Sequence, residues 1–500
     1  MGSLHGLSAS PSIKSLVAGE VAGRGPVELF RPAMEMTPMP LRLRRIDCAR
    51  GDAAAELAGL RTLLGAQSQV VSARSENLTR QVFGAALTPQ QVVERVCDRV
   101  RTEGMPALLE FTRLFDRAQL TPQTLRVTPA ELLEAYAASS ATDPAFLEVT
   151  RRIRKNLLSF QTSILHRDAM LRHPGNMEVG IRYRPVRRVA MMVPAGAASY
   201  PSTLLMTACP AQAAGVLERV VVMPPTPFGG NNTNMLALCH ELGITEVYRM
   251  GGAQAVAALA YGVAGICPVD MIVGPGNLFV ALAKKLVYGV VGIDCIAGPS
   301  EVVVLADPKA PAAFIAAEML AQAEHSPGSS VLVCWSAGQV EAVAGQIETR
   351  LANLSRAELT RDALERYGAL VLARDENEAV GITNQLAPEH LQIAANNPKA
   401  LADRIDHAGA IFLGHYSPVA LGDYAAGPSH VLPTGGSARW ASGLTSNDFL
   451  KRTSIIHFEP AGLCEIAPEV LAMADYEGLT AHAESVRVRL AALADGQGVP

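Results

Sequence analysis

The sequence places an amide and an imidazole where they could share a cation. Gln322 and His325 lie three positions apart in AQAEH, so on a helix their side chains emerge from the same face. Zinc sites in proteins use three or four ligands and favour histidine and carboxylate, so this pair could be part of a metal site whose other ligands lie elsewhere. Taken alone, the pair is more typical of a polar helix end that faces solvent.

A second candidate is the dipeptide Glu389-His390, which stands directly before an apolar stretch in LAPEHLQIAA. A buried acid and imidazole are costly unless they are paired or take part in chemistry. Neighbours in an extended segment point in different directions, so the two could serve separate proton transfers. An exposed pair is the common alternative.

Two further stretches carry a carboxylate and a histidine. Asp423 and His430 lie in a Gly/Pro-rich loop after AIFLG, and Glu477 and His482 lie near the start of a helical stretch close to the C-terminus. Long loops at strand ends often carry function. The alternatives are a turn-capping carboxylate at Asp423, a structural His430 and a solvated His482.

Two glycine-bearing turns end strands and open helices. One runs from Gly251 to Gln254 and the other from Gly274 to Asn277. Glycine lets a ligand approach the backbone, and the N–H groups at a helix start favour an anion such as pyrophosphate. Neither turn has the G-x-G-x-x-G pattern, and two such turns on one sheet edge leave a nucleotide site and two plain strand-to-helix connections as equal alternatives.

The elements that must position these residues form two α/β modules. Residues 52–160 show helical apolar spacing, and from Val189 short β-rich runs alternate with helices, an alternation that begins again after Ser300. This pattern predicts parallel sheets covered on both faces, with ligands at the carboxyl ends of the strands. The tail from about Leu444 looks mostly helical and is too short to fold alone.

The composition describes an ordinary globular chain. Apolar residues make up 49% of the 500 residues and charged residues 18%, with 47 acidic and 43 basic side chains. No basic block interleaved with aromatic residues indicates nucleic acid, and the apolar runs are shorter than the roughly 20 residues that span a bilayer. The eight cysteines form no C-x-x-C pair, so we expect reduced thiols and a cytoplasmic protein.

Read together and in order, the motifs resemble the histidinol dehydrogenase family, over about Val100 to Arg489. The motifs that carry the resemblance are VGPGN at 273–277, GIDCIAGPSE at 292–301, AQAEH at 321–325, LAPEHLQI at 386–393, GDYAAGPSHVLPTGG at 422–436, ASGLTSNDFLKRTSI at 441–455 and EGLTAH at 477–482.

The resemblance implies a role for each candidate residue. The zinc ligands would be Gln322, His325, Asp423 and His482. Glu389 and His390 would be the acid/base pair, and the substrate would contact both of them, the four zinc ligands, Ser300 and Glu477. Gln254 and Asn277 would contact NAD. Met192 and Ala195 depart from the family pattern, which has Tyr and Gly there, beside the expected NAD site.

The family implies two Rossmann-like domains and a homodimer whose tails complete each other's active sites. The domains would be a disordered extension at 1–38, a helical region at 39–188 packed on the second α/β domain, an NAD-side domain at 189–300, a zinc and catalytic domain at 301–443, and a dimerisation tail at 444–500. The boundary at 38 rests on composition, since residues 1–38 are rich in Ser, Gly, Pro and Met and show no sustained periodicity, which predicts that the folded protein begins near Met39.

The implied reaction oxidises L-histidinol through bound L-histidinaldehyde to L-histidine, with one Zn²⁺ per subunit and two NAD⁺. His390 would take the alcohol proton, and Glu389 would activate water on the aldehyde. Rival interpretations are a zinc- and NAD-dependent dehydrogenase of another small alcohol, such as a sulfonated diol, a zinc hydrolase, and a catalytically silent binding protein.

Overall fold

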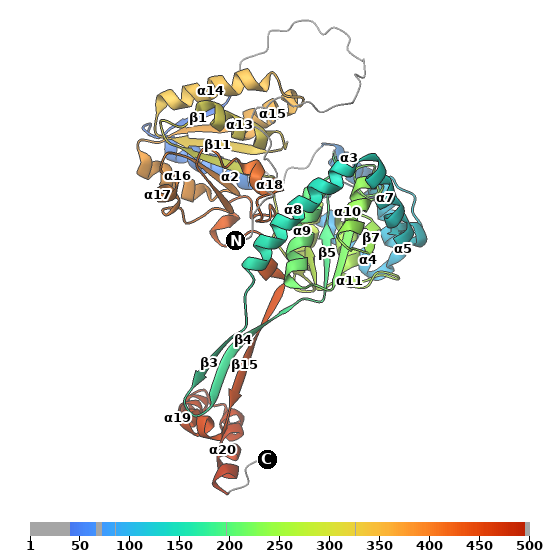
Figure 1. Ribbon diagram of the computed structural model, residues 1–500, viewed down its shortest axis with the longest axis vertical. Coiled ribbons are helices and arrows are strands. Elements are labelled where there is room, and N and C mark those ends of the chain that lie inside the picture. The colour runs from blue at the N-terminus through green and yellow to red at the C-terminus, as the bar shows by residue number, and fades with distance from the viewer. Residues whose placement is uncertain (1–40, 67–72, 86, 197, 326, 496–500) are drawn as a thin grey trace, which may run out of the picture. The chain divides into compact units, whose positions relative to one another are not determined.

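The computed structural model describes residues 41–66, 73–85, 87–196, 198–325 and 327–495 (Figure 1). These residues belong to one compact unit that begins at Leu41. The predictions for residues 1–38 and for a start near Met39 lie outside the described residues.

Two six-stranded sheets carry the described chain. In spatial order the first sheet contains β2 (Arg126–Val127), β7 (Glu246–Arg249), β6 (Glu218–Met223), β5 (Arg188–Met192), β8 (Met271–Val273) and β9 (Gly292–Ile293). The second contains β1 (Arg44–Asp47), β12 (Ala369–Leu372), β11 (Ser329–Cys334), β10 (Glu301–Ala306), β13 (His390–Ala394) and β14 (Ala410–Leu413).

The two sheets share one strand order. In each, the five successive strands lie in the order third, second, first, fourth, fifth, and all of them pair in parallel. This is the order of the classic dinucleotide-binding fold. Each sheet has one extra edge strand beside its third strand, antiparallel β2 in the first and parallel β1 in the second. The prediction of two Rossmann-like α/β domains is therefore confirmed.

Helices cover both faces of the second sheet (Figure 1). One face holds α13 (Ala312–Ala323), α14 (Ala337–Leu351) and α15 (Ala357–Tyr367), and the other holds α2 (Ala53–Ala66), α16 (Glu376–Leu386) and α17 (Pro398–Ala402). Because strand side chains alternate between faces, Val302 and Val304 of β10 enter one core and Val303 and Leu305 the other. This explains why β10 is apolar at successive positions.

The first sheet is covered in the same way. One core includes α4 (Pro89–Glu103), α5 (Met105–Phe115), α11 (Gly252–Tyr261) and α12 (Leu278–Val287), and the other α7 (Pro129–Thr142), α8 (Pro144–Ser163), α9 (Pro201–Ala214) and α10 (Thr233–Glu241). The sequence predicted that region 39–188 packs on the second domain. In the structure β1 and α2 lie there, whereas α4, α5, α7 and α8 lie against the first sheet.

Local sequence explains where the helices of this region begin. Thr88 precedes α4, and its hydroxyl accepts a hydrogen bond from the backbone N–H of Gln91, while the Gln91 side chain accepts one from the backbone N–H of Thr88. Pro89 occupies the first helical position, where a missing N–H costs nothing. The same capping arrangement, formed by Thr128, Pro129 and Glu131, begins α7.

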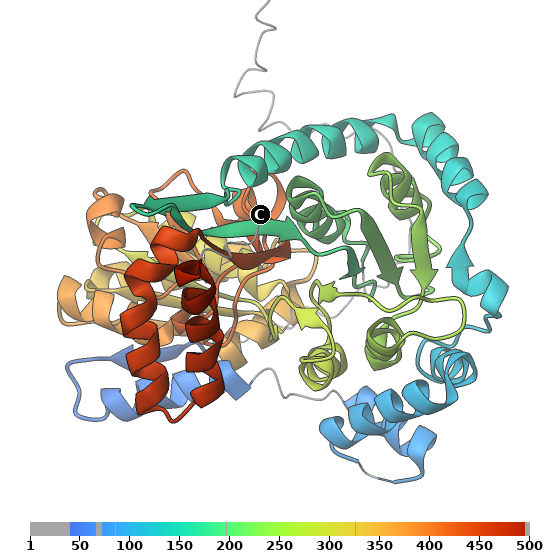
Figure 2. The same cartoon turned by 90° about the horizontal axis from the view of Figure 1, so that it is seen from below.

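The chain ends in a separate element built from two distant segments. Antiparallel strands β3 (Ala169–His173), β4 (Met177–Pro185) and β15 (Leu450–Phe458) form a three-stranded ribbon. The ribbon leads to α19 (Pro460–Tyr476) and α20 (Thr480–Ala494), which lie side by side (Figures 1 and 2). The sequence predicted a mostly helical tail, so β15 is a feature it did not identify.

The short elements complete the chain. They are α3 (Ala73–Phe83), α6 (Pro122–Leu125), α18 (Val419–Tyr424), and the 3-10 turns η2 (Ser437–Arg439) and η3 (Ser446–Phe449). Among the described residues, no helix combines the length and apolar character needed to cross a membrane.

Candidate active site

The candidate acid/base pair lies at the amino ends of two central strands of the second sheet. β10 and β13 pair with Val302 opposite His390, so Glu301 and Glu389 stand side by side just before that pair. Glu389 and His390 are 5% and 3% exposed. The sequence predicted ligand sites at the carboxyl ends of the strands. Glu389 precedes β13 and His390 is its first residue, which agrees with their place directly before an apolar stretch, so these two residues lie at the edge opposite the carboxyl ends.

Glu389 is fixed by donors from β10. Its Oε2 accepts a hydrogen bond from the Ser300 hydroxyl at 2.6 Å and another from the backbone N–H of Glu301 at 2.8 Å. Glu301 returns the contact, since its Oε1 accepts from the backbone N–H of Glu389 at 3.3 Å and from that of Gly435 at 3.1 Å. Burial raises the pKa of Glu389, so this carboxyl group binds a proton more readily than an exposed one.

His390 presents one ring nitrogen for proton transfer. Its Nδ1 lies 3.1 Å from the backbone carbonyl oxygen of Glu301, which can only accept, so Nδ1 carries a proton. Nε2 has no hydrogen-bond partner and lies 3.6 Å from Oδ1 of Asp423. Burial lowers the pKa of His390, but the charges of Glu389 and Asp423 outweigh burial and raise it to about 9. Nε2 is therefore the atom that can exchange a proton with a substrate.

Two of the predicted ligands lie on helices that are in contact, Gln322 in α13 and Asp423 in α18, and His325 follows the end of α13. The backbone N–H of Val419, in α18, donates to Glu318 Oε2, in α13, at 3.0 Å. Gln322 lies one helical turn after Glu318, on the same face. It is 3% exposed, and its Nε2 has no partner within the described chain.

Three nearby histidines affect the pKa of Asp423. Burial alone would raise the pKa of Asp423, but His390, His430 and His325 together lower it below the ordinary value. The Asp423 carboxylate therefore stays ionised in this site. The ring of His430 contacts the backbone oxygen of Asp423 at 2.9 Å, which agrees with the structural role that the sequence suggested. Within the described ranges, no group of three or more His, Cys, Asp or Glu side chains could hold a metal.

Glu477 and His482 lie in the tail helices. Glu477 follows the last residue of α19, and His482 lies in the first turn of α20. Both residues are exposed. In the described part of a single chain, neither forms a hydrogen bond or an ion pair with Gln322, His325 or Asp423. Within one chain, Gln322 and Asp423 lie on helices in contact, and His325 and Asp423 influence each other's pKa, whereas His482 forms no bond with any of them in the described residues.

The two predicted cofactor residues follow the carboxyl ends of β7 and β8 in the first sheet. Gln254, in α11, is 1% exposed, donates to Asp116 Oδ2 at 3.2 Å and leaves its Oε1 without a partner in the described chain. Asn277 caps α12, because its Oδ1 accepts from the backbone N–H groups of Phe279 and Val280, both at 3.1 Å. Its side-chain oxygen is thus committed to the helix, and its amide N–H groups remain for a ligand.

Two residues at these sites escaped the sequence analysis. Glu301 supports Glu389 and the loop at Gly435, and Asp116, at the end of α5, holds Gln254. A signal for Glu301 was present, since a carboxylate opens the otherwise apolar strand EVVVLA. Asp116 had no such signal, because nothing in a helix end at position 116 indicates a partner at 254.

Glu301 should make stability depend on pH. Burial and the charge of Glu389 raise the pKa of Glu301 from 4.5 to about 8. Between these values the folded chain keeps a proton that the unfolded chain has released, so rising pH favours unfolding through this group. Glutamine does not titrate, so Glu301→Gln removes this contribution to the pH dependence of stability. The Tm of the variant minus that of the wild type should therefore be more positive at pH 8 than at pH 5, by about 2 °C or more in thermal melts.

Glu301→Ala is the matched control for this prediction. It also removes the titrating proton, but it leaves the backbone N–H groups of Glu389 and Gly435 without their acceptor, so we expect a lower Tm than for Glu301→Gln at both pH values. An equal difference between Glu301→Gln and the wild type at pH 5 and pH 8 would contradict a raised pKa at Glu301.

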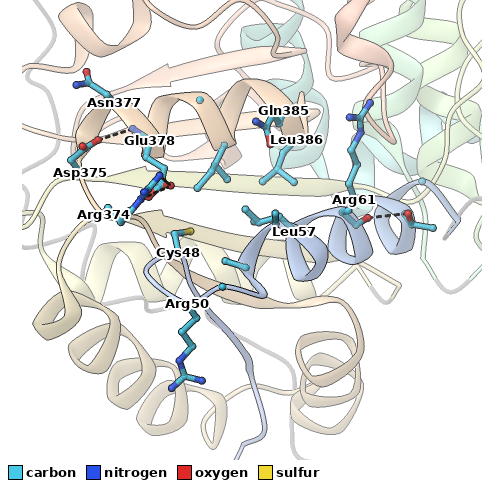
Figure 3. Close-up of a pocket in the computed structure, with 18 of the residues that line it drawn as sticks. Cys48, Arg50, Leu57, Arg61, Arg374, Asp375, Asn377, Glu378, Gln385 and Leu386 are labelled. Atoms are coloured by element: carbon cyan, nitrogen blue, oxygen red, sulfur yellow. Dashed lines mark hydrogen bonds and ion pairs between the residues drawn. The ribbon is translucent and has the colours of Figure 1, made fainter.

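A cavity of about 1140 Å³ lies between α2 and α16 (Figure 3). None of the predicted site residues lines it. Two of its charged lining residues, Arg374 and Glu378, form an ion pair at 2.6 Å. Its link to the candidate site is Gly435, whose N–H binds Glu301. The cavity therefore borders the loop at Gly435 that Glu301 supports, and none of its lining residues is a candidate ligand.

Comparison with known proteins gives one consistent answer. A family model for histidinol dehydrogenase matches residues 83–490. Histidinol dehydrogenase of Rhodopirellula baltica is 54% identical over 443 residues, which cover 89% of this chain and 96% of that protein. That of Geobacter sulfurreducens is 44% identical over 436 residues, covering 86% and 98%.

A solved structure agrees with the sequence matches. The crystal structure of histidinol dehydrogenase from Elizabethkingia anophelis superposes with a TM-score of 0.81 at 30% identity, covering 91% of this chain and all of that chain. The match includes both sheets and the tail, since it spans nearly the whole described chain. On these matches, the chain belongs to the histidinol dehydrogenase family.

Proposed function

We propose that this protein oxidises L-histidinol through bound L-histidinaldehyde to L-histidine and uses two NAD⁺, the last steps of histidine biosynthesis. The observation that carries the proposal is the buried pair Glu389 and His390, placed beside Asp423 at the amino ends of β10 and β13. Family membership supplies the substrate and the cofactor. The geometry supplies two separate proton-transfer groups, as two successive oxidations require.

His390 is proposed to serve the first oxidation. The Glu301 carbonyl keeps Nδ1 protonated, so the neutral form of His390, in which Nε2 has lost its proton, would take the alcohol proton at Nε2 while hydride passes to NAD⁺. Because the pKa of His390 is raised to about 9, this neutral form becomes more abundant as pH rises. Glu389 is proposed to serve the second. Ser300 and the backbone N–H of Glu301 orient its carboxylate, which would take a proton from the water that adds to the aldehyde. Groups in these roles typically contribute about a hundredfold to ten-thousandfold each.

The residues of α13 and α18 fit one Zn²⁺ per subunit. Gln322 offers the oxygen of a buried amide, Asp423 an ionised carboxylate and His325 an imidazole. Burial lowers the pKa of His325, which favours the neutral imidazole that a metal binds. When bound, zinc would anchor the imidazole and amine of the substrate and so orient its carbinol. The same ligand types also suit manganese and cobalt.

The fourth ligand is proposed to come from a second copy of the chain. Glu477 and His482 are exposed at the end of the ribbon, next to apolar side chains that a single chain leaves open, with Ile456 74%, Met473 60% and Tyr476 89% exposed. Burial of these side chains against another copy would stabilise a homodimer. The tail would then bring the partner's His482 to the zinc and the partner's Glu477 to the substrate.

NAD⁺ is proposed to bind along the carboxyl edge of the first sheet. Gln254 and Asn277 face this edge from the starts of α11 and α12, and the unpartnered Oε1 of Gln254 is free to accept a hydrogen bond from a ligand. Met192 and Ala195 follow the same edge at β5 and are almost fully buried. We expect them to shape the pocket by packing, since neither offers a polar side chain.

Metal analysis combined with an NADH assay tests the proposal. Purified protein should contain one Zn²⁺ per subunit and release two NADH per L-histidinol. Removal of zinc by a chelator should abolish NADH formation, and added zinc should restore it. Turnover of a sulfonated diol without turnover of histidinol would assign the chain a different alcohol. Hydrolysis that needs no NAD⁺ would favour a zinc hydrolase.

A further inference from the structure

A buried ion pair lies beneath the second glycine turn and takes no part in the chemistry described above. Lys284 belongs to α12 and Asp294 follows β9, and each side chain is only 2% exposed. The two are in direct contact. Burying two charges costs several kcal/mol per ion before their attraction is counted, so such a pair is weak evidence for stability by itself. Its contacts show what else it does.

The pair binds both backbone polar groups of one residue, Gly274. Asp294 Oδ2 accepts the backbone N–H of Gly274 at 2.6 Å, and Lys284 Nζ donates to the backbone oxygen of Gly274 at 3.0 Å. Gly274 has φ +105°, and a Cβ built on it would lie 2.3 Å from the backbone oxygen of Met192. A side chain at this position would collide with that oxygen, so the backbone here requires glycine, and two charged side chains hold it in place.

The backbone of Gly274, held by these two hydrogen bonds, sets the direction of the turn that follows. Pro275 and Gly276 lead directly to Asn277, which caps α12 through its own oxygen. Lys284 lies on that same helix, so the pair ties the first residue of the turn to the helix that the turn opens. A shift of Gly274 would therefore shift the amide of Asn277 and the N–H groups at the start of α12.

Asp294 also begins the short segment that reaches the acid/base pair. Its Oδ1 accepts the backbone N–H of Cys295 at 2.7 Å, and further along the segment the N–H of Gly298 donates to the Thr434 hydroxyl at 2.6 Å. The segment ends at Ser300, whose hydroxyl binds Glu389. One stretch of eight residues, 294–301, thus connects the cofactor turn of the first sheet with the catalytic carboxylate of the second.

We propose that Lys284 and Asp294 are positioning residues that hold the Gly274–Asn277 turn in the shape that binds the dinucleotide. The proposal rests on the proposed binding of NAD⁺ at this edge. In this proposal Lys284 and Asp294 do not contact the substrate. If the pair served packing alone, its loss would leave the affinity for the cofactor unchanged.

The test compares Asp294→Asn and Lys284→Met with the wild type in the zinc-loaded enzyme. We expect KM for NAD⁺ to rise at least about tenfold, with KM for histidinol and zinc content unchanged. Titration of NADH fluorescence should show the same loss of affinity. If a single variant fails to fold because it leaves one buried charge alone, the double variant Lys284→Met with Asp294→Asn, which leaves no charge, gives the same comparison.

A matched control is the buried pair of Arg188 and Glu246 in the same sheet, 10% and 20% exposed in their side chains. Arg188 opens β5 and Glu246 opens β7, so this pair lies at the amino edge, opposite the turns. Glu246→Gln should lower Tm and leave KM for NAD⁺ unchanged. If folded Asp294 and Lys284 variants keep KM for NAD⁺ within twofold of the wild type, the positioning role is overturned. Wild-type protein that binds no NADH would instead overturn the proposed function.

Discussion

His390→Asn should slow the oxidation of L-histidinol to the aldehyde by about a hundredfold to ten-thousandfold. Asparagine keeps a polar side chain at this buried position, but it has no counterpart to Nε2, the ring atom that faces Asp423 without a hydrogen bond. The proposed ligands Gln322, His325 and Asp423 are untouched, so zinc content should stay at the wild-type value. Single-turnover NADH formation and metal analysis on the same sample measure both quantities.

His430→Asn is the control for this prediction. His430 is also buried near Asp423, but its ring contacts the backbone oxygen of Asp423 and the Thr203 hydroxyl, at 2.9 and 3.4 Å. It has no proposed proton to transfer, so we expect its loss to lower Tm more than it lowers the rate of the chemical step. If His390→Asn oxidised histidinol at the wild-type rate, His390 would not be the base.

Mixing two inactive variants should restore activity. His482→Ala should lose zinc affinity, because it removes the ligand proposed to come from the partner's tail, and His390→Asn should lose the base. In a mixed dimer, one site combines the intact sheets of the first variant with the intact tail of the second. We expect about half of the wild-type activity per mixed dimer, measured as NADH formation after the two proteins are unfolded and refolded together.

The control for recovery pairs His390→Asn with Asp423→Asn. Both substitutions lie in the sheet-bearing part of the chain, so neither site of a mixed dimer is intact and no recovery is expected. Activity in this control would show that the recovery seen with His482→Ala and His390→Asn does not depend on the tail of the partner subunit. Verified mixed dimers of His482→Ala and His390→Asn that stay inactive would argue that the tail serves its own chain.

The sequence predicted the fold well because apolar periodicity is a local signal. β10 and the strands around it read as short apolar runs between helices, and the structure confirms two parallel sheets with one strand order. The candidate residues Glu389 and His390 could be picked out because charged groups stood beside an apolar strand. Their proximity to Asp423 could not be derived from spacing, since 33 positions separate Asp423 from His390.

Other features could not be predicted because they depend on distant partners. The proximity of Glu301 to Glu389 follows from the pairing of β10 with β13, which no local pattern specifies. β15 reads LKRTSIIHF, with four successive polar residues, and becomes a strand because β4 pairs with it along all nine positions. Asp294 and Lys284 gave no signal either, since their common partner is the backbone of Gly274.

The ribbon limits how the C-terminal helices can be detached. Since β15 provides one of its three strands and residues 169–185 the other two, a chain cut after Phe449 would not lose a dispensable appendage. It would keep a two-stranded hairpin with a freshly exposed hydrogen-bonding edge, a template for aggregation. Truncation is therefore the wrong tool for producing a monomeric form of this protein. Charged substitutions at Ile456 or Met473, whose side chains already face outward, would leave the strand pairing intact.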